Sequence, residues 1–199
     1  MPRNAAKPRE TYHVGNLEPQ LLIQAKRMLE EVGPTKISIR AIAEQLGVSA
    51  TAVYYHFANK DELLSRLAAT GFSELEFVLN QALAESTATT ILKEVSLAYF
   101  RFAKRNPTMY QLMFGVQMTC CAQRCSAQEG PYKLFTQVIA EVMKDSNPSQ
   151  DIIKQKYFTF FSVIHGLIAI NIINKSDILE TINAQILKDA IGGIIKSIQ

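Results

Sequence analysis

The sequence predicts an all-α protein, and three observations support this prediction. Apolar residues recur at the helical spacings of three and four along nearly the whole chain of 199 residues. No alternation of the strand type appears between the turn signals, and no internal repeat is present. Hydrophobic residues make up 48% and charged residues 20% of the chain, so a substantial core can form and a disordered polyelectrolyte is excluded.

The first predicted helix carries one apolar stripe, formed by Leu21, Leu22, Ala25, Met28, Leu29 and Val32. Gly33 and Pro34 then interrupt the pattern. A second, short helix follows, with Ser38 as its N-cap and Gly47 as its left-handed C-terminal residue. Ser49 can cap a third helix of about two turns.

The fourth predicted helix is the longest. It starts at Asn59, which can act as its cap, and Asp61 and Glu62 in its first turn suit the positive end of the helix dipole. Its apolar stripe continues for about six turns, to Leu83, so this helix leaves the first three behind.

Further helices are predicted for residues 91–104, 109–114, 132–144, 151–174 and 177–198. The segment 115–131 is predicted to be a loop, because it shows no clear period and contains Gly130 and Pro131. The most apolar stretch, Tyr157–Ile173, is short for a membrane span and polar in its middle, so a buried helix is expected there.

The second and third helices, with Gly47 between them, follow the plan of a helix-turn-helix. The angle between the two helices would be fixed by a small core of Ile42, Ala43, Leu46, Val48, Val53 and Phe57. Small side chains at Ala50 and Thr51 would let the helix N-terminus approach base edges, where a threonine can bond a base or touch a thymine methyl. Tyr54 would offer a hydroxyl to a phosphate.

Two further groups near this motif could contact the same phosphate backbone. His56 offers a ring N–H, and Lys60 brings a positive charge at the start of the next helix. The spacing alone leaves another interpretation open, because short amphipathic helix pairs also occur in proteins that never touch DNA and Tyr55 could be half-buried.

The stretch Thr35–Leu64, TKISIRAIAEQLGVSATAVYYHFANKDELL, resembles the DNA-binding domain of the TetR family of bacterial repressors. The matching positions are Ile42, Ala43, Leu46, Gly47, Val48, Ser49, Tyr54, His56, Phe57, Asn59, Lys60 and Leu63. The resemblance implies that DNA contacts fall on Ser38, Arg40, Ser49, Ala50, Thr51, Tyr54, Tyr55, His56 and Lys60. Because Ala50 has no side-chain hydrogen bond to offer, Thr51 and Arg40 become the expected base readers.

Two other segments resemble one subgroup of that family, whose C-terminal domain carries a Trp-x-x-x-His-Gly segment. These are RETYHVGNLEPQLLIQAKRMLEEVGP near the start of the chain and FFSVIHGLIAI at Phe160–Ile170. The tryptophan is absent here, and Phe160 or Phe161 stands near its place. We therefore expect three parts: a basic arm at 1–16, a helix-turn-helix domain at 17–62, and a C-terminal helical domain for effector binding and dimerisation at 63–199.

A homodimer is expected, because an operator read by one short helix needs two copies for affinity. The predicted interface residues are Gly166, Ile170, Leu187, Ile191, Ile194 and Ile195, with ordinary intrachain core as the alternative. An adaptable apolar cavity for a small effector is predicted around Phe100, Met109, Met113, Phe114, Phe135, Phe158, Phe161 and His165. These residues could equally be core, and His165 a satisfied core histidine.

Cys120, Cys121 and Cys125 are odd in number and lack the spacing of a zinc site. No disulfide framework, metal or other cofactor is expected, and a reducing cytoplasm without membrane attachment fits best, while a thiol sensor stays open. The net charge of +3 equals the three cations of residues 1–9, a segment that could follow a phosphate backbone or be a solvated tail.

The expected function is that of a sequence-specific transcription regulator that binds a near-palindromic DNA operator as a dimer and is released by a small apolar effector. A repressor is expected, although the sequence does not separate a repressor from an activator. The alternative is a helix-turn-helix used as a protein-interaction or nucleoid-associated module. An enzyme is not expected, because the chain shows no phosphate-binding glycine loop, metal cluster or Ser-His-Asp arrangement.

Overall fold

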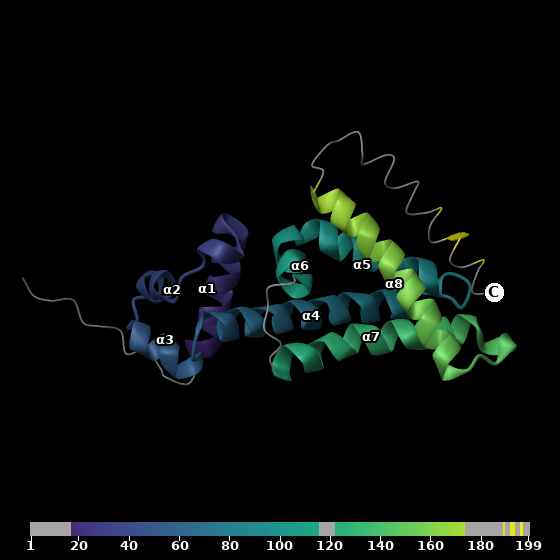
Figure 1. The fold of residues 1–199 in the computed structure, drawn as a ribbon, viewed down its shortest axis with the longest axis horizontal. Helices are drawn as coiled ribbons and strands as arrows, with labels where there is room; N and C mark the ends of the chain where they lie inside the picture. The colour runs from purple at the N-terminus through teal and green to yellow at the C-terminus, as the bar shows by residue number, and fades with distance from the viewer. Residues whose placement is uncertain (1–16, 116–121, 174–188, 190–191, 194–195, 197–199) are drawn as a thin grey trace, which may run out of the picture. The chain divides into compact units, whose positions relative to one another are not determined.

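The computed structural model describes residues 17–115 and 122–173, together with residues 189, 192, 193 and 196. Within these ranges the chain forms α-helices and short 3₁₀ turns and no strand, which confirms the all-α prediction (Figure 1). The elements are α1 (Leu17–Val32), η2 (Pro34–Lys36), α2 (Ile39–Gln45), α3 (Ala50–His56), α4 (Lys60–Ala84), α5 (Ile91–Arg105), α6 (Pro107–Phe114), α7 (Ala122–Val142), η3 (Lys144–Ser146) and α8 (Gln150–Ile173).

The chain divides into two compact units, Met1–Leu63 and Leu64–Gln199. In the first unit, α1 and α2 pack together and α2 packs on α3. Their shared core contains apolar side chains from all three helices, namely Leu17, Leu21, Ala25, Met28, Leu29, Ile39, Ile42, Ala43, Val53 and Phe57. Leu46 and Val48, which were predicted to belong to this core, are half-buried at its edge.

The turn between α2 and α3 is built by Gly47, whose φ of 66° lies in the left-handed region. Its N–H donates to the Glu44 carbonyl at 3.1 Å, and the Val48 N–H donates to the Ala43 carbonyl at 2.9 Å. This pair of bonds is the Schellman arrangement that closes a helix with glycine, so the predicted turn is confirmed. The turn thus ends α2, and α3 begins only a few residues later.

The helix starts show which capping predictions hold. The Ser49 hydroxyl accepts from the Ala52 N–H at 3.1 Å, and the Asn59 side-chain oxygen accepts from the Glu62 N–H at 2.8 Å. The Glu62 carboxylate in turn accepts from the Ala58 N–H at 2.8 Å. Ser38 occupies the predicted N-cap position of α2, and its side chain makes no capping hydrogen bond there.

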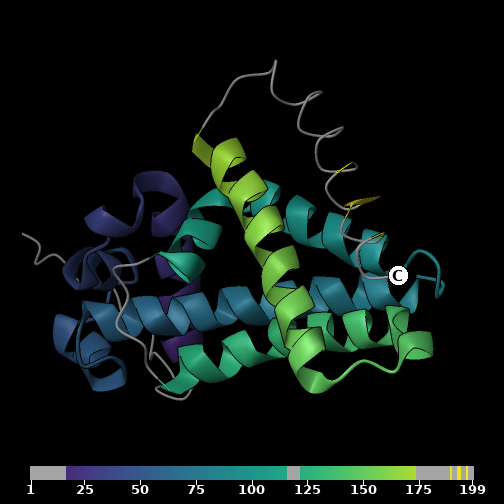
Figure 2. The same ribbon diagram turned by 45° about the vertical axis from the view of Figure 1, so that its right-hand side comes forward.

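In the second unit, α8 packs against α5 and α7, as Figures 1 and 2 both show. Most of α4 belongs to this unit, and it contributes the buried apolar residues Leu67, Phe72, Leu75 and Leu79 to the core. Gly71 lets α6 approach α4 closely, because a Cβ there would lie only 2.8 Å from the Met113 sulfur and 2.9 Å from the Met109 sulfur. None of the described helices is long and apolar enough to cross a membrane.

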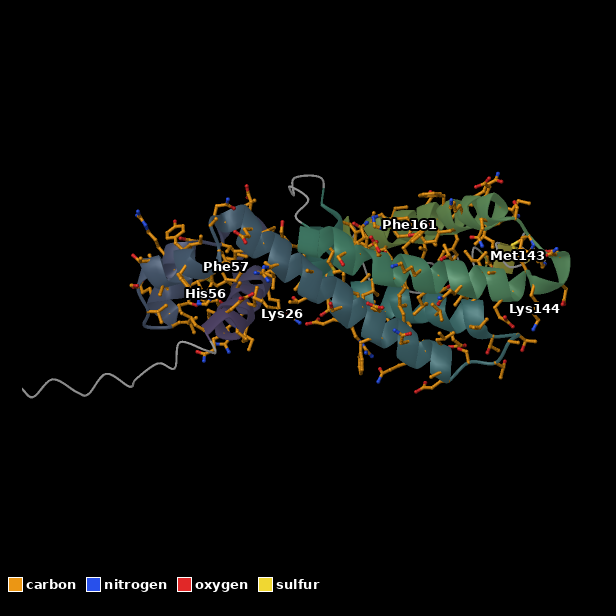
Figure 3. The ribbon with its side chains drawn as sticks, turned by 90° about the horizontal axis from the view of Figure 1, so that it is seen from below. Lys26, His56, Phe57, Met143, Lys144 and Phe161 are labelled. Carbon is orange, nitrogen blue, oxygen red and sulfur yellow. The ribbon has the colours of Figure 1, made fainter. Side chains whose placement is uncertain are left out.

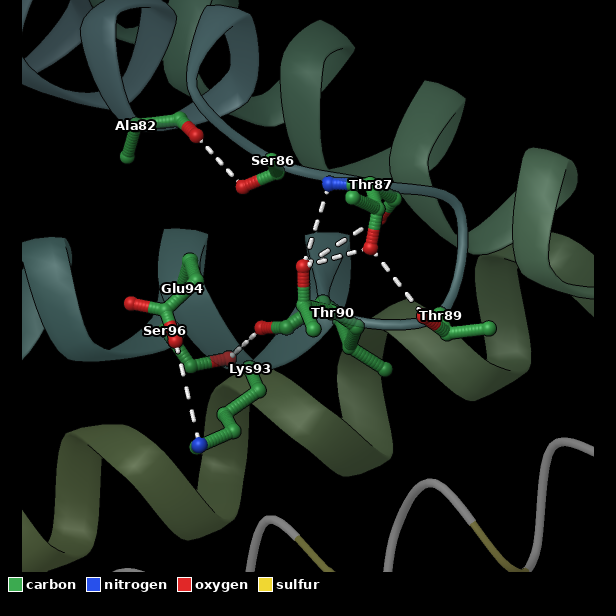
Figure 4. A network of polar contacts seen from close by, with 9 residues as sticks. Ala82, Ser86, Thr87, Thr89, Thr90, Lys93, Glu94 and Ser96 are labelled. Carbon is green, nitrogen blue, oxygen red and sulfur yellow. Dashed lines mark hydrogen bonds and ion pairs between the residues drawn. The ribbon is translucent and has the colours of Figure 1, made fainter.

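The connection from α4 to α5 is closed by its own polar side chains. The Thr87 hydroxyl lies 3.0 Å from the hydroxyls of both Thr89 and Thr90, and the Ser86 hydroxyl donates to the Ala82 carbonyl (Figure 4). Threonine and serine hydroxyls can take the place of backbone partners in such a turn.

The segment 115–131 departs from the sequence prediction, since α7 begins at Ala122 and the loop interpretation of residues 122–131 is therefore wrong. Gly130 and Pro131 suggested a break, yet both lie inside the helix. Gly130 faces the end of the flexible Glu76 side chain of α4, since a Cβ at this position would lie 2.2 Å from the Glu76 carboxylate. Pro131 is buried, and the ion pair from Glu129 to Lys133 at 2.9 Å spans this turn of the helix.

Candidate nucleic-acid interface

Helix α3 has two opposite faces of different chemistry. Val53 and the following Phe57 are fully buried in the core of the first unit. On the other side Thr51 is exposed, Tyr54 has 50% of its surface exposed and Tyr55 has 84% exposed. Each of these tyrosines presents a ring with a hydroxyl at its tip to the solvent. The outward face therefore offers hydroxyls at the end of a short helix.

The start of α3 is shaped for a close approach. Ala50 is half-buried and carries no polar group, while Thr51 stands exposed beside it. The Ser49 hydroxyl oxygen is already used as the cap for the Ala52 N–H, which leaves its own hydrogen to donate outwards. The predicted contact residues at this end of α3 are thus brought together on one side.

The neighbouring helix α2 and the start of α4 add the cationic groups. Arg40 is exposed in the first turn of α2, and Ser38 is half-buried just before it. The Lys60 ammonium donates to the Thr35 carbonyl at 2.8 Å, so it fastens the η2 turn to the start of α4. The positive charge of Lys60 stays at the surface, but the side chain also has a structural partner that the sequence did not indicate.

His56 is placed differently from the sequence expectation. Only 15% of its side chain is exposed, and its Nδ1 lies 3.9 Å from the Glu18 carboxylate at the start of α1. Figure 3 labels His56 and the buried Phe57 beside it at the end of α3. This imidazole links α3 to α1, so a phosphate contact would have to use its remaining ring edge. The Tyr55 ring stands edge-on to it, with 5.4 Å between ring centres.

One polar residue of this unit was missed in the sequence. Gln24 lies within the apolar stripe of α1, is only 7% exposed, and donates from its side-chain amide to the side-chain oxygen of Gln45 on α2. A polar residue three positions after Leu21 and one before Ala25 is the signal that could have indicated it. Among the residues that the structure describes, no group of three His, Cys, Asp or Glu side chains could hold a metal ion.

The second unit holds a chain of three polar groups among aromatic rings, two of them buried and the third, His165, half-buried. The Tyr99 hydroxyl lies 3.3 Å from that of Tyr110, and Tyr110 is also hydrogen-bonded to Nδ1 of His165. Burial raises the pKa of both tyrosines and lowers the pKa of His165, which favours the neutral form of all three groups. The His165 ring stacks on Phe161 at 4.8 Å and meets Phe114 edge-on at 4.7 Å.

The predicted pocket residues fall into three groups in the structure. Met109, Met113 and Phe135 are buried, while Phe100, Phe114, Phe161 and His165 are half-buried (Phe161 is labelled in Figure 3). Phe158 is 60% exposed and lies on the outer side of α8, so its assignment to an internal cavity is wrong. The helical period explains the error, because Phe160 and Phe161 turn inwards and Phe158 is two positions away.

The predicted dimer residues are described only in part. Gly166 and Ile170 lie on the exposed side of α8, and a Cβ at Gly166 would meet no atom within 4 Å. Val163 and Ala169 are exposed near them. Leu187, Ile191, Ile194 and Ile195 lie outside the described residues, as do Cys120, Cys121 and the arm at 1–16.

Two family models match this chain and together cover most of it. The model described as "Bacterial regulatory proteins, tetR family" matches residues 21–67, which contain the helix-turn-helix and its exposed face. The model described as "Tetracyclin repressor-like, C-terminal domain" matches residues 92–183. The chain belongs to the TetR family. This family consists of bacterial regulatory proteins, and the resemblance seen in the sequence is confirmed.

Curated relatives match half of this chain or less. The chain is 29% identical to the HTH-type transcriptional regulator Mb1846 of Mycobacterium bovis over 102 residues, which are 50% of this chain and 44% of that protein. It is 42% identical to the tetracycline repressor protein class A from transposon 1721 of Escherichia coli over 59 residues, 29% of this chain and 27% of that protein. The chain thus spans less than half the length of these relatives.

Solved structures share the TetR fold along nearly the whole chain. A protein of unknown function from Rhodococcus sp. RHA1 has a TM-score of 0.78 at 24% identity, covering 95% of this chain and 98% of its own. The fatty acid degradation regulator FadR from Bacillus halodurans has a TM-score of 0.71 at 16% identity, covering 91% of this chain and 95% of its own. At these identities the likeness shows the fold alone.

Proposed function

We propose that this protein binds DNA in a sequence-specific way and acts as a transcriptional repressor. The observation that supports this most is the division of α3, with Val53 buried behind it and Thr51, Tyr54 and Tyr55 exposed in front. A recognition helix needs this arrangement, because one face must hold the angle to its neighbour while the other enters a major groove.

The exposed groups divide into base readers and backbone contacts. Thr51 stands in the first turn of α3, where a hydroxyl and a methyl can both reach a base edge, and Arg40 can form two parallel bonds to a guanine. Tyr54, Tyr55, Ser49 and Lys60 suit phosphate oxygens, which fix the register of the helix without reading sequence. Ala50 leaves room for the helix to come close.

A homodimer follows from the size of this reading surface. One helix of seven residues reads only a few base pairs, so a second copy is required for useful affinity. The outer side of α8 supports this assembly, since it carries an exposed apolar strip of Val163, Gly166 and Ile170. The central residue of the strip, Gly166, has no side chain. A partner helix could approach closely at Gly166. The operator would then be near-palindromic.

The second unit is the proposed sensor. Met109, Met113, Phe114 and Phe161 supply adaptable apolar surface, and Tyr110 with His165 supplies the few polar groups that orient a ligand. We infer a small, apolar effector that repacks the helices against α4. Because α4 continues from the first unit into the second, a change in its packing reaches the DNA-binding helices and releases the operator.

The test is selection of duplexes from a random-sequence pool with the purified full-length protein, followed by gel-shift titration over a range of salt. The proposal predicts enrichment of two related, inverted half-sites about 10 base pairs apart, and a linear fall of log affinity with log salt. Sequence-independent binding would favour a nucleoid-associated module, and absence of binding would favour a protein-interaction module. Either result would overturn the proposal.

A further inference from the structure

The first unit contains a buried amide, that of Gln24, which bonds to the exposed Gln45 side chain, and core formation alone does not explain this bond. Gln24 of α1 is 7% exposed, and its amide nitrogen donates to the side-chain oxygen of Gln45, the last residue of α2. The partners are 21 positions apart in sequence, so the bond joins two helices directly. Gln24 sits among Leu21, Ala25 and Met28, where an apolar side chain would pack at least as well.

The energetics of this pair favour orientation over stability. A hydrogen bond adds only modestly to net stability, whereas a buried amide left unpaired, as Gln24 would be without Gln45, is costly. An apolar residue of the same shape at position 24 avoids that cost altogether. A hydrogen bond is directional and apolar packing is not, so the amide pair selects one position of α2 along α1.

The hydrogen bond between Gln24 and Gln45 lies at the end of α2, just before the turn that leads into α3. Gln45 directly precedes Leu46 and Gly47, and the turn bonds Gly47 to Glu44 and Val48 to Ala43 hold these residues as one piece. Fixing the side chain of Gln45 on α1 therefore fixes where the turn ends and where Ser49 caps the start of α3. A small shift at this turn would move Thr51 relative to a base edge.

We propose that Gln24 is a positioning residue for DNA recognition, which acts through its hydrogen bond to Gln45 and sets the placement of α3 in the major groove. This inference rests on the proposed DNA-binding function. It predicts that removing the bond lowers discrimination between DNA sequences more than it lowers stability, because phosphate contacts tolerate a small rotation of α3 and base contacts do not.

The experiment compares four full-length variants with the wild type. Gln24→Met removes the bond without leaving a buried amide unpaired, Gln45→Ala removes it from the other side, and the double variant completes a cycle. Gln20→Met, a glutamine-to-methionine change one turn earlier on α1, is the matched control. The readout is the ratio of affinities for the duplex that the wild type selects from a random pool and for a scrambled duplex of equal composition, together with the unfolding temperature.

We expect Gln24→Met to unfold at the wild-type temperature or slightly above and to lose about tenfold in the affinity ratio, the size of one good base contact. The Gln45→Ala change should lower the affinity ratio about as much in the wild type, and should lower it little further in Gln24→Met. An unchanged ratio in Gln24→Met, or an equal loss in Gln20→Met, would overturn the inference.

A full loss on adding Gln45→Ala to Gln24→Met would show that Gln45 contacts DNA itself, and this too would overturn the inference. A wild type that selects no duplex at all would instead refute the proposed function, and the positioning role would fall with it.

Discussion

The two units place their tyrosines in opposite environments. In the first, Tyr54 and Tyr55 turn their rings outwards on α3. In the second, Tyr99 and Tyr110 are buried, and their hydroxyls bond to each other. A buried hydroxyl must find a partner within the protein, whereas an exposed one is available to a partner from outside. The difference separates residues that maintain the fold from residues that are free to recognise a ligand.

The histidines show a less complete division. His165 is bonded to Tyr110 and surrounded by aromatic rings, and burial lowers its pKa. His56 belongs to α3, the proposed recognition helix, yet most of its side chain is covered and its Nδ1 faces Glu18. A residue on the right helix is thus not by itself a contact residue, and the predictions below test where the division between fold and recognition falls.

The largest effect on stability is expected from the buried member of the tyrosine comparison. Tyr99→Ala would remove a fully buried ring that contacts Tyr110, Phe135 and Phe161, and should lower the free energy of unfolding by about 3–5 kcal/mol. Tyr55→Ala should change it by less than about 0.5 kcal/mol, since the ring is mostly in water. Urea denaturation followed by circular dichroism measures both, and similar losses in the two variants would contradict the comparison.

The next effect is on DNA affinity, and we expect it only from the tyrosine substitution in the first unit. Tyr54→Phe deletes an exposed hydroxyl that is proposed to bond a phosphate, so affinity should fall about tenfold at most and equally for all duplexes. Tyr99→Phe, which removes a buried hydroxyl, should leave DNA affinity unchanged for the folded protein. Gel-shift titrations at one salt concentration give both values. An effect of Tyr99→Phe as large as that of Tyr54→Phe would remove the distinction.

A smaller loss of stability is expected at the turn between α2 and α3, the proposed recognition helix. Gly47→Ala places a Cβ at a φ of 66°, which should cost about 1 kcal/mol. Gly47→Asn is the control, because asparagine tolerates the left-handed region better than alanine. Thermal unfolding should rank the wild type above the asparagine variant and the asparagine variant above the alanine variant. An alanine variant as stable as the wild type would show that the turn is not constrained.

The smallest effect is a pH dependence of the second unit. Because burial lowers the pKa of His165, the unfolded chain binds more protons than the folded one as pH falls through the ordinary histidine value of about 6.5. The resulting penalty is absent above that pH, grows as pH falls through it and levels off below the lowered pKa. His165→Gln should therefore lose less stability than the wild type between pH 7 and pH 5, with His56→Gln as the control.

Identical pH slopes for the wild type and His165→Gln would contradict this assignment. The slopes come from urea denaturation repeated at several pH values, with the same signal used for each protein. Only the difference between the variants is interpreted, since other titrating groups contribute equally to each.

Local signals made the first unit predictable from its sequence. Gly47, Ser49 and Asn59 each act within four residues of themselves, and the structure contains the turn and the two caps that they predict. The exposed face of α3 followed from the helical period once Val53 and Phe57 were placed inside. The bonds from Gln24 to Gln45 and from Lys60 to Thr35 could not be predicted, because their partners are more than 20 positions apart.

The second unit was harder to predict for the same reason. Gly130 and Pro131 resemble a helix break, but both lie inside α7, where Gly130 faces the Glu76 side chain of α4 and Pro131 is buried, a placement that no local pattern contains. The orientation of Phe158 also depends on which side of α8 meets α5 and α7. Where packing between distant helices decides the outcome, composition indicates a core without saying which aromatic residues belong to it.

The most direct test of the account is a loss-of-contact experiment at Thr51, the exposed side chain in the first turn of α3. Affinities of the wild type and of Thr51→Ala are measured for the selected operator and for the set of its single-base-pair variants. The account predicts that Thr51→Ala no longer discriminates at one position of each half-site and keeps its preferences elsewhere. If Thr51→Ala ranks every variant as the wild type does, the outward face of α3 does not read DNA through this residue.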